Sequence, residues 1–303
     1  MNQITLYVSN ITENLITVKC DNTIIIKDLK EIIAERIGDC KHYCFSLISN
    51  NIELDDNAFC NTVLKDNSKL FYMMRLNLER EILLEIKQKL GTTNLNWNRN
   101  IELTEWNYIE IDNNNNLKFK VKELEVYSVK LIKIPTEIGL LINLNNLSLY
   151  HCKLIEKIPT QIGQLVNLNI LDLSSNKLSG IIPTEIRNLV NLNNLCLFDN
   201  NLIGKIPTEI GESVNLTSLT LMSNKLTGKI PTVIGESVNL KYLDLYDNKL
   251  NGKIPIEISQ LVNLNYLCFN NNKLSGIIPT ELGKLVNLNK LNLSHNTYRN
   301  WRT

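Results

Sequence analysis

The sequence predicts an α/β protein in which a small α+β domain precedes a solenoid of 24-residue repeats with a parallel sheet on its concave face. All seven prolines lie 24 residues apart, from Pro135 to Pro279, and self-similarity at such a period marks a stack of repeats. Residues 1–76 lack this period and read as short strands around one helix, and residues 77–118 begin with a second helical pattern. We therefore expect three parts, at residues 1–76, 77–118 and 119–303.

The first part begins with two segments rich in β-branched residues, "ITLYV" and "LITVKC", which the polar turn "SNITEN" separates. This pattern predicts a β-hairpin. The segment "TIIIKDLKEIIAERIG" predicts a helix, with Thr23 as its N-cap and Gly38 just past its end. Two further strands are expected in "HYCFSLI" and "SKLFYMMRL".

A hairpin, a helix and two more strands within about 75 residues resemble ubiquitin and its β-grasp relatives. The resemblance implies an exposed apolar patch at Ile48, Phe71 and Met73, although a one-residue register slip would turn the last two inward. The alternative is that these residues serve the core or contact the following helix. The Gly-Gly terminus needed for conjugation is missing, because "MMRLNLERE" runs straight on. The domain is thus expected to dock to ubiquitin-handling proteins and not to be conjugated.

Residues 77–118 are expected to close the start of the solenoid. An apolar stripe at helical spacing consists of Leu78, Ile82, Ile86 and Leu90, with Asn77 as the N-cap and Gly91 at the end. Trp97 and Trp106 follow. This order resembles the N-terminal cap of plant receptor and inhibitor ectodomains, but no cysteine lies between Cys60 and Cys152, so the cap's usual disulfide is absent.

Seven copies of the template L-x-x-L-x-L-x-x-N-x-L-x-G-x-I-P then follow, after a degenerate first rung. The L-x-L pair alternates with the period of a short strand, and stacked strands share one leucine core. The asparagine amide can satisfy backbone groups of its own rung and of the neighbouring rung. Glycine permits a tight bend, and proline fixes φ after it. The template resembles the plant-type leucine-rich repeat.

The stretch "LYHCKLIEKIP" gathers residue types that occur in catalytic or metal sites, yet the repeat register accounts for it. Cys152 occupies the asparagine position of its copy and should be buried, and Glu156 replaces the loop glycine and should face solvent. A single histidine, His151, without a second ligand nearby does not predict a metal site. We expect no catalytic, cofactor-binding or metal-binding residues.

The concave face is expected to bind a protein client, because its outward positions vary between copies while the structural positions do not. Exposed aromatic side chains beside carboxylates suit a protein-binding surface. The candidate residues are Tyr150, Asp172, Phe198, Met222, Tyr242, Asp244, Tyr246 and Tyr266. The alternative is that these are tolerated surface residues.

Composition narrows the function classes. A formal net charge of +1 with no basic run argues against nucleic acid and against membrane partners. No signal peptide, membrane span or catalytic motif is visible, and the seven cysteines are scattered and odd in number, so we expect a cytoplasmic, non-enzymatic protein. Two readings stay open: an adaptor that joins a client to the ubiquitin pathway, or a plain binding or inhibitory repeat protein with a passive β-grasp appendage.

Overall fold

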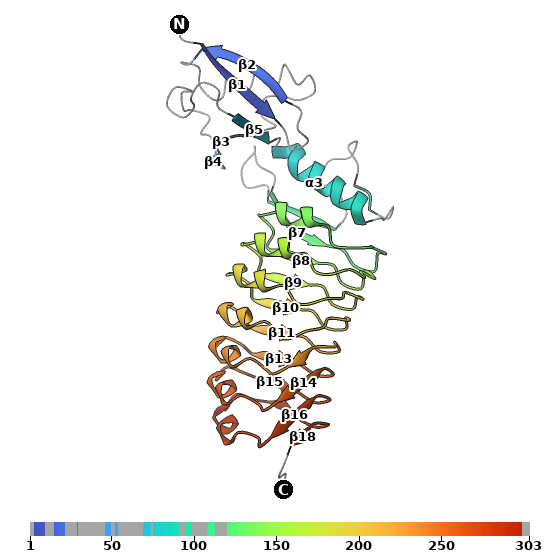
Figure 1. Ribbon diagram of the computed structural model, residues 1–303, viewed down its shortest axis with the longest axis vertical. Helices are drawn as coiled ribbons and strands as arrows, with labels where there is room; N and C mark the ends of the chain where they lie inside the picture. Colours follow the sequence, from blue (N-terminus) through green and yellow to red (C-terminus); the bar gives the residue numbers. More distant parts are fainter. Residues whose placement is uncertain are drawn as a thin grey trace. The chain divides into compact units, whose positions relative to one another are not determined.

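A computed structural model describes residues 3–9, 15–21, 29, 46–49, 52–53, 69–73, 75–90, 95–97, 108–112 and 120–298 (Figure 1). The chain divides into two compact units, residues 1–81 with 112–120 and residues 82–111 with 121–303. Among these described residues, no helix combines the length and the apolar character that a bilayer crossing requires.

The first unit holds a five-stranded sheet in the order β2-β1-β5-β3-β4. Its strands are β1 (Gln3–Ser9), β2 (Leu15–Asp21), β3 (Ser46–Ser49), β4 (Ile52–Glu53) and β5 (Lys69–Met73). Strand β1 pairs antiparallel with β2 and parallel with β5, whereas β3 pairs antiparallel with β5 and β4. Most of the helix predicted before Gly38 lies outside the described residues, but Leu29 is helical and buried.

Helix α3 spans Arg75–Leu90 and therefore begins two residues before the expected N-cap. The prediction that Asn77 caps the helix was wrong, because β5 ends at Met73 and the chain is already helical from Arg75. The helix ends directly before Gly91, as expected, and buries Ile82 and Ile86 of the predicted stripe. The candidate cap residue Trp106 lies outside the described residues.

The second unit stacks one rung per repeat around a nine-stranded sheet in the order β17-β15-β13-β11-β10-β9-β8-β7-β6 (Figure 1). The strands are β6 (Ile109–Asp112), β7 (Lys120–Glu125), β8 (Asn146–Ser148), β9 (Ile170–Asp172), β10 (Asn194–Cys196), β11 (Ser218–Thr220), β13 (Tyr242–Asp244), β15 (Tyr266–Cys268) and β17 (Lys290–Asn292). From β8 onward, residues 24 apart pair in parallel register. The parallel sheet predicted from the L-x-L pairs is confirmed.

Each proline is followed by one short 3-10 helix, which returns the chain toward the next strand. Proline φ angles between −72° and −61° start these helices in a backbone conformation that the pyrrolidine ring fixes. The helices are η3 (Thr136–Leu140), η4 (Thr160–Gln164), η5 (Thr184–Asn188), η6 (Thr208–Glu212), η7 (Thr232–Glu236), η8 (Ile256–Gln260) and η9 (Thr280–Lys284). A second, smaller sheet comprises β12 (Thr227–Gly228), β14 (Lys249–Gly252), β16 (Lys273–Gly276) and β18 (Thr297–Tyr298).

The asparagine column joins successive rungs inside the core. Asn176 Oδ1 accepts hydrogen bonds from the amides of Cys152 at 2.9 Å and Leu154 at 3.0 Å. Its Nδ2 donates to the carbonyls of Leu149 in the preceding rung and Leu173 in its own. The expected dual role of the amide is confirmed. Cys152, which replaces asparagine in its rung, is fully buried, as predicted.

Candidate binding surfaces on the repeat unit

The outward side chains of the nine-stranded sheet form a surface that we call the sheet face. In each strand from β8 to β15 the central residue points into the core and the first and third residues point outward, as the alternation of a strand requires. Because the rungs pair in register, equivalent residues line up along the stack. Any repeat position thus becomes a column of neighbours about 4.8 Å apart.

One column carries a pair of aromatic rings at the C-terminal end of the sheet. The Tyr242 and Tyr266 rings, on neighbouring strands, stack with centroids 4.1 Å apart and planes 13° apart. Lys290, the next residue of the same column, places its Nζ 4.8 Å from the centroid of Tyr266. This geometry is that of a cation over a ring face. Lys290 is not among the predicted residues, although its spacing from Tyr266 is the same 24 residues that joins the two tyrosines.

Asp244 lies beneath this cluster and is not an exposed carboxylate. It was predicted to point outward into solvent, but only 2% of it is exposed, because Tyr242 and Tyr266 lie over it and hydrogen-bond to it. Its Oδ1 also accepts the amide of Tyr246 at 2.9 Å. Burial raises the pKa of Asp244 despite these hydrogen bonds and the nearby charge of Lys290.

The cluster also includes the thiol of Cys268, which pairs with Asp244 across the two strands. It is buried, and its Sγ lies 2.8 Å from Asn270 Oδ1. Burial raises its pKa, and the nearby Asp244 charge acts in the same direction. A thiol whose pKa is raised is a poor nucleophile, so the cluster has the chemistry of a binding surface and lacks an activated thiol.

The other predicted residues of the sheet face are spread over five rungs. Asp172 is half-buried at the end of β9, where its Oδ1 accepts from the amide of Ser174 at 2.9 Å. Tyr150 is 42% exposed and lies tilted against His151, with ring centroids 5.9 Å apart. The remaining candidates in the column that follows the strands are partly exposed, and they are Phe198, Met222 and Tyr246. Ser174 interrupts this column, so Tyr150 lies apart from the others.

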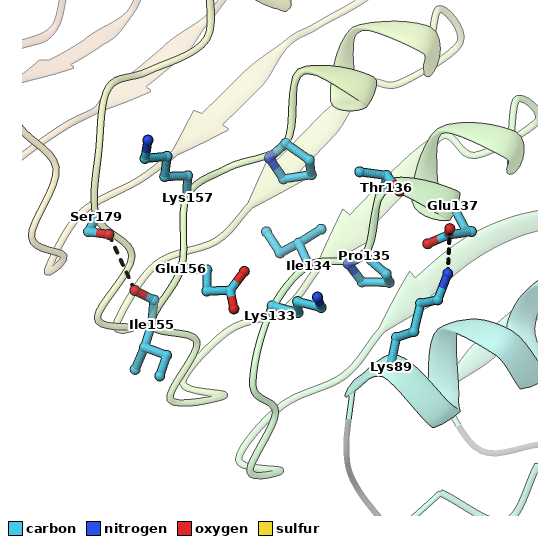
Figure 2. Close-up of a pocket in the computed structure, with 11 residues that line it drawn as sticks. Lys89, Lys133, Ile134, Pro135, Thr136, Glu137, Ile155, Glu156, Lys157 and Ser179 are labelled. Atoms are coloured by element: carbon cyan, nitrogen blue, oxygen red, sulfur yellow. Dashed lines mark hydrogen bonds and ion pairs between the residues drawn. The ribbon is translucent and has the colours of Figure 1, made fainter.

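A hollow of about 530 Å³ lies where helix α3 meets the first rungs, lined by residues such as Lys133, Ile155 and Lys157 (Figure 2). On one side, Lys89 of α3 forms an ion pair with Glu137 of η3. Burial alone would raise the pKa of Glu137, but the hydrogen bond from Lys89 and its charge outweigh burial and hold the pKa below its ordinary value. This pair fastens the cap helix to the first rung.

The proposed patch of the first unit is placed only through its strand register. Ile48 of β3 pairs directly with Phe71 of β5, and Met73 pairs with Ser46. The backbone therefore brings Ile48 and Phe71 opposite each other across two strands.

Within the part of the chain that the structure describes, no group of three or more metal-ligating side chains occurs.

Comparison with known proteins supports the repeat assignment. The model for the Leucine Rich Repeat matches residues 143–165, 167–189, 215–237, 239–261 and 263–285. No curated protein matches the chain.

Solved structures similar to this chain include plant and bacterial repeat proteins. The LRR ectodomain of the Arabidopsis thaliana membrane receptor kinase GASSHO1/SCHENGEN3, in complex with CASPARIAN STRIP INTEGRITY FACTOR 2, is 35% identical with a TM-score of 0.62. The match covers 72% of this chain but 30% of the ectodomain, so this chain spans about a third of that structure. The Leptospira interrogans LRR protein LIC12759 is 38% identical with a TM-score of 0.52, covering 58% of this chain and 43% of that one. A plant ice-binding protein is 27% identical with a TM-score of 0.57, covering 73% and 80%.

Proposed function

We propose that this leucine-rich repeat protein is a non-enzymatic binding protein whose sheet face holds a basic segment of a protein partner. The observation that carries this proposal is the stacked pair Tyr242 and Tyr266 above the buried Asp244. The similarity to an Arabidopsis ectodomain solved with a bound factor is consistent with it.

The tyrosine column leaves one ring face without an aromatic neighbour. Tyr266 has Tyr242 on one side and Lys290 on the other. Tyr242 has Tyr266 on one side, while on its other side the strand β11 presents the small Ser218. A lysine or arginine side chain of a partner fits over Ser218 against the open face of Tyr242, in the way that Lys290 already lies over Tyr266. Such a contact contributes about 0.5–2 kcal/mol, depending on how far the cation is desolvated.

The carboxylates of the sheet face favour the same kind of partner. Asp172 and Asp247 are partly exposed, and Asp199 is exposed. Asp199 and Asp247 directly follow Phe198 and Tyr246, and Asp172 lies on the rung between those of Tyr150 and Phe198, so a basic segment along the sheet meets rings and carboxylates in turn. Phe198 and Tyr246 would then serve as apolar anchors, because a buried aromatic contact contributes more than a charge at the rim.

The experiment is selection of random displayed peptides on the immobilised full-length chain. We expect enriched peptides to carry lysine or arginine, and the double variant Tyr242→Ala, Tyr266→Ala to lose them. The control Val190→Ala removes an exposed side chain elsewhere in the repeats and should keep binding. Enrichment of acidic peptides, or equal retention by the double variant, would contradict the proposal.

The first unit suggests a finer function, in which residues 1–76 dock to ubiquitin-handling proteins and the repeats hold the client. This proposal rests on the resemblance to β-grasp proteins, and the sheet order β2-β1-β5-β3-β4, with β1 parallel to β5, is consistent with that resemblance. Affinity capture from a eukaryotic extract with the full chain would test it. Ile48→Asp should lose ubiquitin-pathway proteins and keep the client, whereas Phe198→Ala should do the reverse. If Ile48→Asp changes nothing, the plain binding protein with a passive appendage is the better description.

A second candidate function follows from the likeness to a plant ice-binding protein. Exposed valines recur once per rung, and they are Val166, Val190, Val214, Val238, Val262 and Val286. Such a regular array of valines, repeated at the spacing of the rungs, is a surface that the lattice of ice can match. Against this, the amides of the adjoining asparagines are engaged, since Asn191 Nδ2 donates to Val166 O at 3.0 Å. Thermal hysteresis of a solution of the chain would decide: a freezing gap supports ice binding, and its absence excludes it.

A further inference from the structure

One flank of the repeats is a basic and apolar surface, which we call the lysine flank. It consists of the residues that follow the asparagine column in six successive rungs: 153–157, 177–181, 201–205, 225–229, 249–253 and 273–277. In each rung the second residue is a leucine that is fully buried, and the first, third and fifth residues point away from the core. The flank thus presents three outward columns along the stack.

The composition of these columns is one-sided. The eighteen outward positions hold nine lysines, four isoleucines, and five serine, threonine or asparagine residues, and none is acidic. The lysines are Lys153, Lys157, Lys177, Lys205, Lys225, Lys229, Lys249, Lys253 and Lys273. All nine are exposed, and among the described residues none of them forms an ion pair. Glu156, at the fourth position of the first rung, is the one carboxylate within these six segments.

The lysine stems are held in a common direction by the repeat itself. A Cβ built at Gly228 would meet Lys205 Cγ at 2.9 Å, and one at Gly276 would meet Lys253 Cγ at 2.9 Å. The stems of the fifth-position lysines, which are Lys157, Lys205, Lys229 and Lys253, therefore lie over the glycine of the next rung. The column of ammonium groups is ordered along the stack by this packing, so part of the entropy cost of aligning the charges is already met in the free protein.

The isoleucines interrupt the lysine columns and are well exposed. Ile181 and Ile277 occupy lysine positions with 58% and 70% of their surface exposed, and Ile155 and Ile203 lie in the middle column at 53% and 49%. Lysines and exposed aliphatic side chains on one face are the combination that binds the interface of an anionic bilayer. The face measures roughly 25 Å by 13 Å, from about 4.8 Å between strands and 3.3 Å per residue.

We propose that the lysine flank binds the surface of membranes that contain anionic lipids, with the lysines at the headgroups and the isoleucines at the acyl boundary. This contact is independent of the sheet face and of any partner bound there. A planar surface meets all three columns at once, whereas a nucleic acid strand would require stacking rings or arginine forks. The thirty residues of the flank contain neither an aromatic residue nor an arginine.

The test is co-sedimentation of the full-length chain with two kinds of vesicle, phosphatidylcholine alone and phosphatidylcholine mixed with phosphatidylserine. We expect binding to the anionic vesicles only, and release at high salt. A lysine near an anionic surface changes the partition coefficient about fivefold, so Lys205→Gln, Lys229→Gln, Lys253→Gln together should lower it about a hundredfold. Ile203→Ser with Ile277→Ser should lower it by about tenfold.

The matched control changes the same amount of charge away from the flank. Arg187→Gln, Lys241→Gln, Lys284→Gln lie in the repeats but outside the three columns, and this variant should bind as the wild type does. Equal losses in the two triple variants would show non-specific attraction and overturn the proposal. Binding to a single-stranded oligonucleotide without binding to anionic vesicles would overturn it as well. Circular dichroism of both variants checks that the exposed substitutions leave the fold intact.

Discussion

The asparagine column makes a quantitative prediction at Asn200. Its Oδ1 accepts the amide of Leu178 at 2.9 Å, and its Nδ2 donates to the carbonyls of Leu173 and Leu197 at 3.0 and 3.2 Å. It also donates to Phe198 O at 3.2 Å. The substitution Asn200→Ala removes all four of these hydrogen bonds at once.

Each of the three carbonyls has a second hydrogen-bond donor, whereas the Leu178 amide has one acceptor. After Asn200→Ala, Leu173 O keeps the amide of Asn176, Leu197 O keeps the amide of Asn224, and Phe198 O keeps the backbone amide of Ser175. The Leu178 amide has no second acceptor among the described contacts. One buried unsatisfied N–H costs about 1–3 kcal/mol, and the weakened carbonyl contacts add about 1 kcal/mol.

We therefore expect Asn200→Ala to lower the free energy of unfolding by about 2–4 kcal/mol. Asn200→Asp keeps the acceptor but turns a carboxylate oxygen toward three carbonyls, so it should cost at least as much at neutral pH. Urea unfolding followed by circular dichroism gives the global effect. Hydrogen exchange of the peptide containing Leu178 gives the local one, and its protection should fall in both variants.

The matched control is Asn201→Ala, because the Asn201 backbone amide bonds to Leu178 O and its side chain lies on the flank. It should leave both measurements within about 0.5 kcal/mol of the wild type, as surface substitutions usually do. If Asn200→Ala also stays within that range, the hydrogen bonds of the asparagine column do not contribute measurably to the stability of the stack.

Three further predictions concern other positions of the repeat unit. Gly252 has a φ of +79°, so Gly252→Ala should lower the free energy of unfolding by about 1–2 kcal/mol. Gly283→Ala should be neutral, because nothing lies within 4 Å of the new Cβ. Thermal unfolding of the two variants compares these effects. Because burial raises the pKa of Asp244, the folded state holds a proton that the unfolded chain releases. The free energy of unfolding should therefore fall as the pH rises from the ordinary carboxyl pKa through the raised one. Asp244→Asn should abolish this slope when unfolding is measured across pH. Burial raises the pKa of Cys152 to about 11. Iodoacetamide at pH about 8 should therefore leave this thiol unlabelled until the chain unfolds. Labelling of the folded chain, seen by mass spectrometry, would contradict the placement of Cys152 in the core.

The sequence predicts most of the repeat unit because each structural position recurs five to seven times. The leucine, asparagine, glycine and proline positions depend on contacts that recur identically from rung to rung. A single copy with an unusual residue, such as Cys152, can then be placed by register alone. The start of α3 has no such repetition, and a possible capping residue, Asn77, was chosen although the helix begins at Arg75.

Asp244 shows where strand alternation stops being informative. Alternation places its side chain on the outer side of the sheet, and the structure agrees with that side. Its burial comes from Tyr242 in the same strand and from Tyr266 in the next rung. The exposure of an outward residue is therefore set by the sizes of its lateral neighbours, which include a residue of the next rung that is 22 residues away in the sequence.

The same lateral arrangement explains why net charge was a weak guide to partners. A formal charge of +1 sums over faces that the solenoid keeps apart, with nine lysines on one flank and Asp172, Asp199 and Asp247 toward the sheet face. No two of these nine lysines are closer than four residues in the sequence, so a search for basic runs finds nothing. Stacking at strand spacing turns these single residues into rows. For a repeat protein, charge should therefore be counted by repeat position, because each position, and not each segment, becomes a surface.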